Sequence, residues 1–284
     1  MAIKNGHRNK LPKQAVRIRQ LEKVFQRTPE SVVAVKNFSL DIAKGEVAVI
    51  LGPSGCGKST VIRVIAGLEK PTSGTVLVND LPVKDPSIEC SMVFQSYTSF
   101  PWLSVIDNIA FGIRYTCKEV NQEERKKKAR HYAKLVGLEE FENAFISTLS
   151  GGMKQRVAIA SALATEPEIM LMDEPFGALD SQTRMVMQEH LLKIVEKTNK
   201  TVVFVTHDIE EALLLGDRIY VCTARPARVL EEIDVSFPHP RTAKTRNLKD
   251  FFSMKNEIFN LLRDQAIEQM LEEKYAERRG KKNG

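Results

Sequence analysis

The chain has 284 residues, of which 43% are hydrophobic and 27% charged, a composition typical of a globular protein and unlike that of a disordered or fibrous one. Its longest apolar runs, such as 47–51 and 212–215, are far shorter than the roughly 20 residues that cross a bilayer, so no membrane-spanning helix is predicted. The formal net charge of +6 is matched by basic residues near the N-terminus. No apolar segment follows them, which argues against a secretory signal and predicts a cytosolic chain.

Residues 1–14 form a polar, basic segment, which is typical of a solvated arm or of contact with anionic lipid or nucleic acid. The cysteines Cys56, Cys90, Cys117 and Cys222 lie far apart and form no CxxC pair. This spacing predicts neither a disulfide framework nor a zinc site, and we expect small buried thiols instead.

The predicted fold begins at residues 15–21, where apolar and charged residues alternate as in an edge strand. Residues 47–51 are a continuous apolar run followed directly by a glycine, which predicts a buried parallel strand and then a helix over 58–65. Further buried strands are predicted at 91–94, 169–172, 201–205 and 218–222. Because helices separate these strands, we expect a parallel sheet covered on both faces.

Apolar residues recur at three- and four-residue spacing over 105–115, 122–136 and 153–164, which predicts three helices. We therefore expect a helical subdomain from about residue 96 to residue 165, inserted into a domain that spans residues 15–240. The tail, residues 241–284, contains an amphipathic segment over 251–275. This segment predicts a helix that packs on the domain or on a second copy of the chain.

A phosphate-binding loop is predicted between the strand 47–51 and the following helix. The sequence there matches the pattern G-x-x-x-x-G-K-[ST], which requires a strand before it and a helix after it. The predicted ATP-binding segment consists of Gly52, Pro53, Ser54, Gly55, Cys56, Gly57, Lys58, Ser59 and Thr60, and its first eight residues match the pattern. Backbone N–H groups of such a loop surround phosphate oxygens, and the helix N-terminus adds its positive end. Lys58 is predicted to neutralise the β- and γ-phosphates, and Ser59 to ligate Mg²⁺. Cys56 is either a small loop residue or a thiol open to alkylation.

Two carboxylates, Asp173 and Glu174, follow the strand predicted at 169–172, and open α/β sheets bind ligands at the carboxyl ends of their strands. Asp173 is expected to hold Mg²⁺ through water, and Glu174 to polarise the attacking water as a general base. The Asp-Glu-Pro sequence alone is also compatible with a surface turn. The phosphate loop upstream favours a nucleotide site.

Paired glycines occur in the segment 149–155, Leu-Ser-Gly-Gly-Met-Lys-Gln, at the start of a predicted helix, where free N–H groups attract an anion. This segment resembles the signature of ABC ATPases. The resemblance implies an α/β P-loop NTPase fold of the ABC type, with a mixed sheet core, an antiparallel β edge and a helical signature subdomain. The resemblance also implies that two protomers form a head-to-tail pair. In this pair, the γ-phosphate of the ATP held by the opposite protomer would be bound by Leu149, Ser150, Gly151, Gly152, Met153 and Gln155.

Other elements of that family follow in order along the chain. Gln95 matches the Q-loop residue that contacts Mg²⁺ and the water, Ala178-Leu179-Asp180 matches the D-loop, and His207 matches the switch histidine at the γ-phosphate. Phe25 lies where an aromatic ring stacks on adenine. The resemblance covers about residues 15–235 and implies an enzyme that hydrolyses ATP with Mg²⁺ through Glu174, His207 and Gln95. Ser161 departs from it, since Ala-Arg is usual there.

Two further segments are similar to ATPases of small-solute importers. Residues 95–112 resemble the region that receives a coupling helix of a membrane subunit, and Phe100 and Trp102 there are either an interface anchor or internal packing. Residues 223–241 resemble a segment of nitrate, sulfonate and taurine importers. The implied protein acts on the cytoplasmic face of the membrane and powers the import of a small anion such as nitrate, bicarbonate, sulfonate or taurine.

The partners implied by this resemblance are a second ATPase subunit, either a second copy of the chain or a paralogue, together with two permease subunits and an external solute-binding protein. Two alternatives share the nucleotide motifs: an ATPase of a lipid-trafficking or efflux system, and a nucleic-acid-associated ABC ATPase. The basic arm and an isoelectric point of about 9.0 are what suggest nucleic acid. The absence of coiled-coil or zinc insertions in the sequence argues against it.

Overall fold

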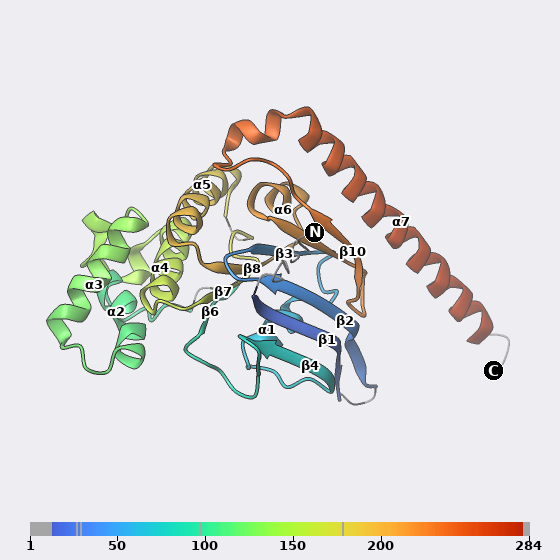
Figure 1. Ribbon diagram of the computed structural model, residues 1–284, viewed down its shortest axis with the longest axis horizontal. Coiled ribbons are helices and arrows are strands. Elements are labelled where there is room, and N and C mark those ends of the chain that lie inside the picture. Colours follow the sequence, from blue (N-terminus) through green and yellow to red (C-terminus); the bar gives the residue numbers. More distant parts are fainter. Residues whose placement is uncertain (1–12, 27, 29, 97, 178, 281–284) are drawn as a thin grey trace, which may run out of the picture.

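The computed structural model describes residues 13–280 except 27, 29, 97 and 178, and side chains up to residue 270 apart from 243 and 268. The basic residues Lys4, Arg8 and Lys10 of the predicted arm, and Ala178 of the predicted D-loop, lie outside the described residues. Figure 1 shows a sheet-containing body in the middle, a group of helices to one side, and a long C-terminal helix on the other.

The central sheet has the strand order β10–β9–β3–β8–β7–β6. All neighbouring strands run parallel except β10, which pairs antiparallel with β9 at one edge. This arrangement confirms the predicted mixed sheet with an antiparallel edge. The strands are β3 (Val47–Leu51), β6 (Cys90–Val93), β7 (Ile169–Asp173), β8 (Thr201–Thr206), β9 (Arg218–Cys222) and β10 (Val229–Asp234).

A second, antiparallel sheet has the order β2–β1–β4–β5 and consists of β1 (Gln14–Phe25), β2 (Val32–Ala43), β4 (Ser73–Val78) and β5 (Leu81–Pro82). The predicted edge strand is wrong: Val16 of β1 pairs with Ile42 on one side and with Val78 on the other. An alternation of apolar and charged residues indicates that one face of a strand is buried. It does not indicate whether the two hydrogen-bonding edges of the strand are paired.

The two faces of the central sheet pack against different layers. Val49 and Leu51 of β3 belong to the core formed with α5 (Ser181–Thr198) and α6 (Ile209–Leu215). Ala48 and Ile50 face the opposite core, which contains α1 (Lys58–Ile65) and the inner side of the antiparallel sheet. The sheet is therefore covered on both faces as predicted, although one cover is largely a second sheet. A strand buried on both faces needs apolar residues at every position, which explains its continuous apolar sequence.

The three predicted helices are present as α2 (Val105–Thr116), α3 (Gln122–Leu135) and α4 (Gly151–Ala164), and they lie together beside β6 and β7 (Figure 1). Short 3₁₀ turns, Glu139–Phe141 and Ile146–Thr148, join α3 to α4. Each α-helix begins at a capping side chain, from Ser104, Asn121 and Ser150, which accepts a backbone N–H three residues later. Such caps satisfy donors that have no partner within the helix.

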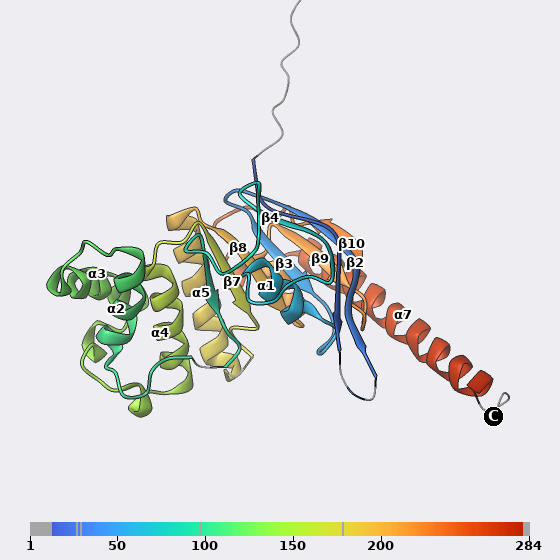
Figure 2. The same ribbon diagram turned by 90° about the horizontal axis from the view of Figure 1, so that it is seen from below.

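The C-terminal segment forms a 3₁₀ turn, η3 (Ala243–Asn247), and the long helix α7 (Lys249–Gly280), which extends the predicted helix at both ends. Phe251 and Ile258 are buried against the domain, whereas Phe252 and Phe259 are exposed. Figures 1 and 2 both show α7 leaving the domain beyond β10. No helix in the described part of the chain combines the length and apolar character needed to cross a membrane.

Candidate active site

The loop between β3 and α1 adopts backbone angles that require glycine. Gly55 has φ +74° and Gly57 has φ +125°. A Cβ atom on Gly57 would lie 2.3 Å from the carbonyl oxygen of Ala34 and 3.1 Å from the Cβ of Ala227. The loop therefore packs directly on the backbone of β2, and this close approach determines where the N-terminus of α1 lies.

Lys58, the first residue of α1, is buried, and its ammonium group is held by the loop itself. Its Nζ donates hydrogen bonds to the carbonyl oxygens of Gly52 at 2.8 Å and Pro53 at 2.7 Å. The same Nζ lies 3.7 Å from Oε1 of Glu174. The positive charge thus lies at the carboxyl end of the central strands, between the loop and the acidic residues.

The two residues predicted to hold Mg²⁺ from the loop and from β7 lie side by side. Ser59 Oγ donates a hydrogen bond of 2.8 Å to Oδ1 of Asp173. Asp173 is buried, and this burial raises the pKa of its carboxyl group. A hydroxyl and a carboxylate oxygen this close together suit a small, hard divalent cation such as Mg²⁺. Gln95, the third predicted ligand, contacts Glu174 instead.

Glu174 is the point where the predicted catalytic residues meet. Gln95 Nε2 donates a hydrogen bond of 3.3 Å to Glu174 Oε2, and His207 Nδ1 lies 3.2 Å from the same oxygen. Glu174 has φ +43°, which is unusual for a residue other than glycine. Its N–H donates to the carbonyl oxygen of Val205 at 3.0 Å, which holds this conformation in place. Such backbone strain is concentrated at functional sites.

A pocket of about 560 Å³ lies over the phosphate loop, a size typical of small-molecule sites. Its lining includes Phe25, Lys58, Ser59, Gln95 and Glu174. The ring of Phe25 is partly buried, and Lys23 Nζ lies 4.8 Å from its centroid. Phe25 thus lies in the same pocket as the loop, where we predicted an aromatic contact with adenine.

Arg225 belongs to this pocket, although the sequence did not indicate it as a nucleotide-site residue. Its Nη2 and Nε donate to the carbonyl oxygen of Gly55 at 2.9 Å and 3.2 Å. The two residues are 170 positions apart in the chain, so no local pattern could have predicted this contact. Arg63 and Glu69 also line the pocket and were not predicted as site residues, because they lie outside the phosphate-loop pattern.

The cysteines are less uniformly buried than we expected. Cys56 and Cys222 are buried, whereas Cys90 and Cys117 are partly exposed. Burial raises the pKa of the Cys56 thiol, so this group stays protonated and unreactive near neutral pH. Of the two alternatives for Cys56, the structure favours the small loop residue over the alkylation site.

The signature residues lie at the start of α4, away from the pocket. Ser150 Oγ accepts a hydrogen bond of 3.3 Å from Met153 N–H, and Leu149 and Gln155 are buried. A Cβ atom on Gly152 would lie 2.5 Å from Cγ2 of Thr183. Among the described residues that line the pocket, none belongs to the signature, so a single chain does not bring signature and phosphate loop together.

Asp180, the described polar residue of the predicted D-loop, caps helix α5. Its Oδ1 accepts N–H hydrogen bonds from Gln182 at 3.1 Å and from Thr183 at 3.0 Å. The hydrogen bond from Thr183 is the main reason that the pKa of Asp180 lies below its ordinary value. Asp180, predicted as a D-loop residue, therefore lies at the end of the segment that connects Glu174 with α5.

The aromatic residues that follow Gln95 differ in how far they are buried. The ring of Phe100 lies 4.5 Å from that of Phe111 and 5.6 Å from that of Trp102, measured between centroids. Trp102 itself is 69% exposed. Phe100 therefore belongs to the packing of the helical region, and Trp102 remains available for a partner.

Comparison with known proteins places this site in context. A sequence model of the family described as "ABC transporter" matches residues 35–177. The chain is 43% identical to the nitrate import ATP-binding protein NrtD of Synechocystis sp., over 89% of this chain and 96% of that protein. It is 45% identical to the taurine import ATP-binding protein TauB of Rhizobium johnstonii, over 82% of this chain and 90% of that protein.

Solved structures of ATP-binding cassettes are also similar to this chain. One is described as the dimeric structure of a post-hydrolysis state of an ATP-binding cassette bound to ADP and Pi. It matches this chain with a TM-score of 0.70 at 36% sequence identity, and it covers 78% of this chain and 100% of its own.

Proposed function

Because this chain belongs to the ABC transporter family as an ATP-hydrolysing subunit, we propose that two such subunits close around two ATP molecules beneath a membrane permease and power the import of a small solute. The observation that carries the proposal is the meeting of Lys58, Gln95 and His207 at Glu174. In this proposal residues 15–240 form the ATPase domain, about 96–165 its helical subdomain, and 241–284 the tail.

We assign the chemistry of hydrolysis to the two carboxylates at the end of β7, Asp173 and Glu174. Ser59 and Asp173 would hold Mg²⁺, which supplies positive charge to phosphate oxygens when bound. Glu174 accepts a proton from the attacking water, and its orientation is set by the hydrogen bond from Gln95 and the 3.2 Å approach of His207 Nδ1. Lys58 neutralises phosphate charge, and this electrostatic positioning is the main source of rate enhancement in phosphoryl transfer.

The proposal includes a second ATPase subunit, because one chain leaves its signature away from its own pocket. Ser150 and Gly151 are exposed at the N-terminus of α4, where backbone N–H groups and the helix dipole attract an anion. In a head-to-tail pair, this helix end faces the ATP held by the other subunit. The dimeric state of the related solved cassette supports this arrangement.

The permease is proposed to dock beside Trp102. A pocket of about 210 Å³ there is lined partly by Phe100, Phe111, Ala158 and Ser161. An exposed tryptophan next to a groove with an apolar wall is the kind of anchor on which protein interfaces depend. Ser161, at the position where the family resemblance expects arginine, contributes a small side chain to this groove.

The imported solute is proposed to be a small solute with an anionic group, of the kinds named in the relatives: nitrate or the sulfonate taurine. The ATPase lies on the cytoplasmic face of the membrane in this proposal, and an external solute-binding protein delivers the solute. The relatives' identities of 43% and 45% over most of the chain support the importer class over a lipid-trafficking or efflux system.

The catalytic assignment is tested with Glu174→Gln. We expect Mg²⁺-dependent ATPase activity to fall by at least about 100-fold, as is typical for loss of a general base, while ATP binding is retained. Glu231→Gln is the matched control, because Glu231 is exposed on β10 and lies outside the pocket. Unchanged turnover of Glu174→Gln would refute the role given to this residue.

The transport assignment is tested by capturing the tagged chain from detergent-solubilised membranes of its host and identifying its partners by mass spectrometry. We expect a polytopic permease together with a solute-binding protein. Trp102→Ala should lose the permease while keeping the ATPase activity of the isolated subunit. Recovery of nucleic acid or of soluble partners alone would overturn the transport assignment and leave the ATPase intact.

A further inference from the structure

The loop that carries His207 is tied down by the hydroxyl group of the residue before it. Thr206, the last residue of β8, is buried. Its Oγ1 donates a hydrogen bond of 2.7 Å to Oε2 of Glu211 and accepts one of 3.0 Å from the N–H of Asp208. The Thr206 hydroxyl therefore connects the residues on both sides of His207 with the buried carboxylate of Glu211.

This carboxylate is held from helix α5 and, beyond it, from the C-terminal segment. Gln188 Nε2, on α5, donates a hydrogen bond of 3.0 Å to Oε1 of Glu211. The amide oxygen of Gln188 accepts a hydrogen bond of 2.6 Å from Nη2 of Arg246, in turn η3. Glu211 and Gln188 are both buried. A chain of side-chain hydrogen bonds thus connects Arg246 with the residue that precedes His207.

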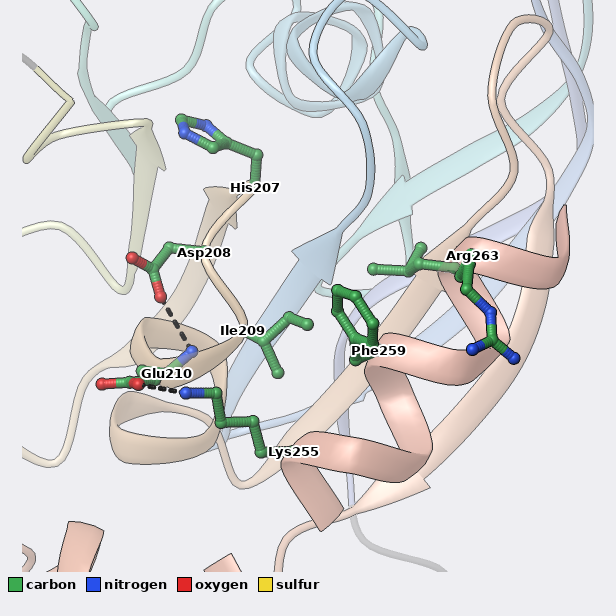
Figure 3. Close-up of a pocket in the computed structure, with 8 residues that line it drawn as sticks. His207, Asp208, Ile209, Glu210, Lys255, Phe259 and Arg263 are labelled. Carbon is green, nitrogen blue, oxygen red and sulfur yellow. Dashed lines mark hydrogen bonds and ion pairs between the residues drawn. The ribbon is translucent and has the colours of Figure 1, made fainter. Parts of the chain in front are cut away.

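A second contact ties the same loop region to α7. Lys255 Nζ donates a hydrogen bond of 2.5 Å to Oε1 of Glu210, in the first turn of α6. Arg246 Nε lies 3.8 Å from the other carboxylate oxygen of Glu210. Figure 3 shows His207, Asp208 and Glu210 following one another at the end of β8, with Lys255 and Phe259 of α7 opposite them. These residues border a pocket of about 650 Å³.

His207 itself has little packing to hold it. Its side chain is 51% exposed, and its contact within the described site is the 3.2 Å approach of Nδ1 to Glu174. The position of its ring therefore depends on the backbone that carries it. Buried polar networks are sensitive to the loss of one member, because each unpaired partner incurs a desolvation penalty and is free to reorient.

We propose that Arg246 is a positioning residue for His207: through Gln188 and Glu211 it holds the loop in the conformation that brings His207 to Glu174. ATP hydrolysis consequently depends on the C-terminal segment being docked on α5 and α6, and a partner that displaces this segment slows hydrolysis. This inference rests on the role proposed for His207 in the active site.

The proposal is tested by comparing Arg246→Gln with Lys244→Gln in the full chain. Lys244 lies in the same 3₁₀ turn, is exposed, and loses the same charge on substitution. For Arg246→Gln we expect a kcat about tenfold lower and a KM for ATP within about twofold of the original, as for a group that acts in the transition state alone. Lys244→Gln should leave both constants unchanged. Arg246→Lys keeps a charged donor and should restore part of kcat.

A double variant separates positioning from a general structural effect. If Arg246 acts through His207, Arg246→Gln should add no further loss of kcat in a His207→Ala background. Losses that multiply would overturn the proposal. Thr206→Val removes the hydroxyl group at nearly constant shape, so it should reproduce the lower kcat and provides the test if Arg246→Gln fails to fold.

Hydrogen exchange of the peptide that covers residues 204–212 reports the loop directly. We expect faster exchange of the Asp208 amide in Arg246→Gln than in Lys244→Gln at equal thermal stability, because Glu211, which holds the hydroxyl that accepts this amide, is itself less firmly held. Unchanged exchange together with unchanged kcat would refute the link. Normal hydrolysis by His207→Ala alone would refute the role of His207, whereas faster exchange in Arg246→Gln would still support the link to the loop.

Discussion

Replacing Arg225 by alanine should weaken ATP binding without slowing the chemical step. Its guanidinium group donates two hydrogen bonds, of 2.9 Å and 3.2 Å, to the carbonyl oxygen of Gly55 in the phosphate loop. A charged donor at an exposed position contributes about 1 kcal/mol, which corresponds to about a fivefold change in affinity. The loop holds phosphates in the ground state and in the transition state alike, so the loss should appear in KM and leave kcat unchanged.

The assay is a titration with a fluorescent ATP analogue, followed by steady-state ATPase kinetics. Arg228→Ala is the matched control, because Arg228 is an exposed arginine of the same segment that does not line the nucleotide pocket. We expect a Kd about fivefold higher for Arg225→Ala and no change for Arg228→Ala, given the contribution estimated from the two hydrogen bonds. Equal Kd values for the two variants, or a fall in kcat at constant KM, would refute the assignment of Arg225 to the loop.

Three further outcomes follow from the same structure. Gly57→Ala should lower Tm by about 2–8 °C and weaken ATP binding, because φ is +125° and the new Cβ would approach the Ala34 carbonyl oxygen. A Tm equal to that of the original chain would contradict this prediction. Cys56 should be alkylated more slowly than the partly exposed Cys117, which peptide mass spectrometry after a timed maleimide reaction measures. Burial raises the pKa of Tyr132 to about 12, so the folded chain binds this proton more tightly than the unfolded chain, and stability falls as pH rises from about 10 towards 12. Tyr132→Phe should lessen that fall in urea unfolding measured across this pH range.

Much of the nucleotide site could be predicted because its residues are neighbours in the sequence. The loop from Gly52 to Thr60 needs glycine for its backbone angles and a buried strand before it, and both requirements are visible locally. Asp173 and Glu174 follow an apolar strand, and strand ends meet at one edge of a parallel sheet. His207 and Gln95 carry no local signal of their own: their roles at the γ-phosphate and at Mg²⁺ were inferred from family resemblance, and only the structure shows both beside Glu174.

The pairing of β1 could not be predicted in the same way. Its alternating sequence correctly indicated a strand with one buried face. Whether its two edges are free or paired depends on segments that return much later in the chain, such as β4. Hydrogen bonds between strands join backbone groups that every residue carries, so side-chain pattern alone does not select the neighbours.

The sequence by itself determined the ABC family, the phosphate loop, the paired carboxylates and the order of the helices and strands, since each depends on a few adjacent residues or on a short period. Tertiary structure alone decided that Arg225 contacts Gly55 and that Arg246 is linked through Gln188 and Glu211 to the loop of His207. In each of these contacts, a long, polar side chain reaches a segment that is distant in the sequence. Their partners are chosen by how the packed elements place them, which no local pattern of residues records.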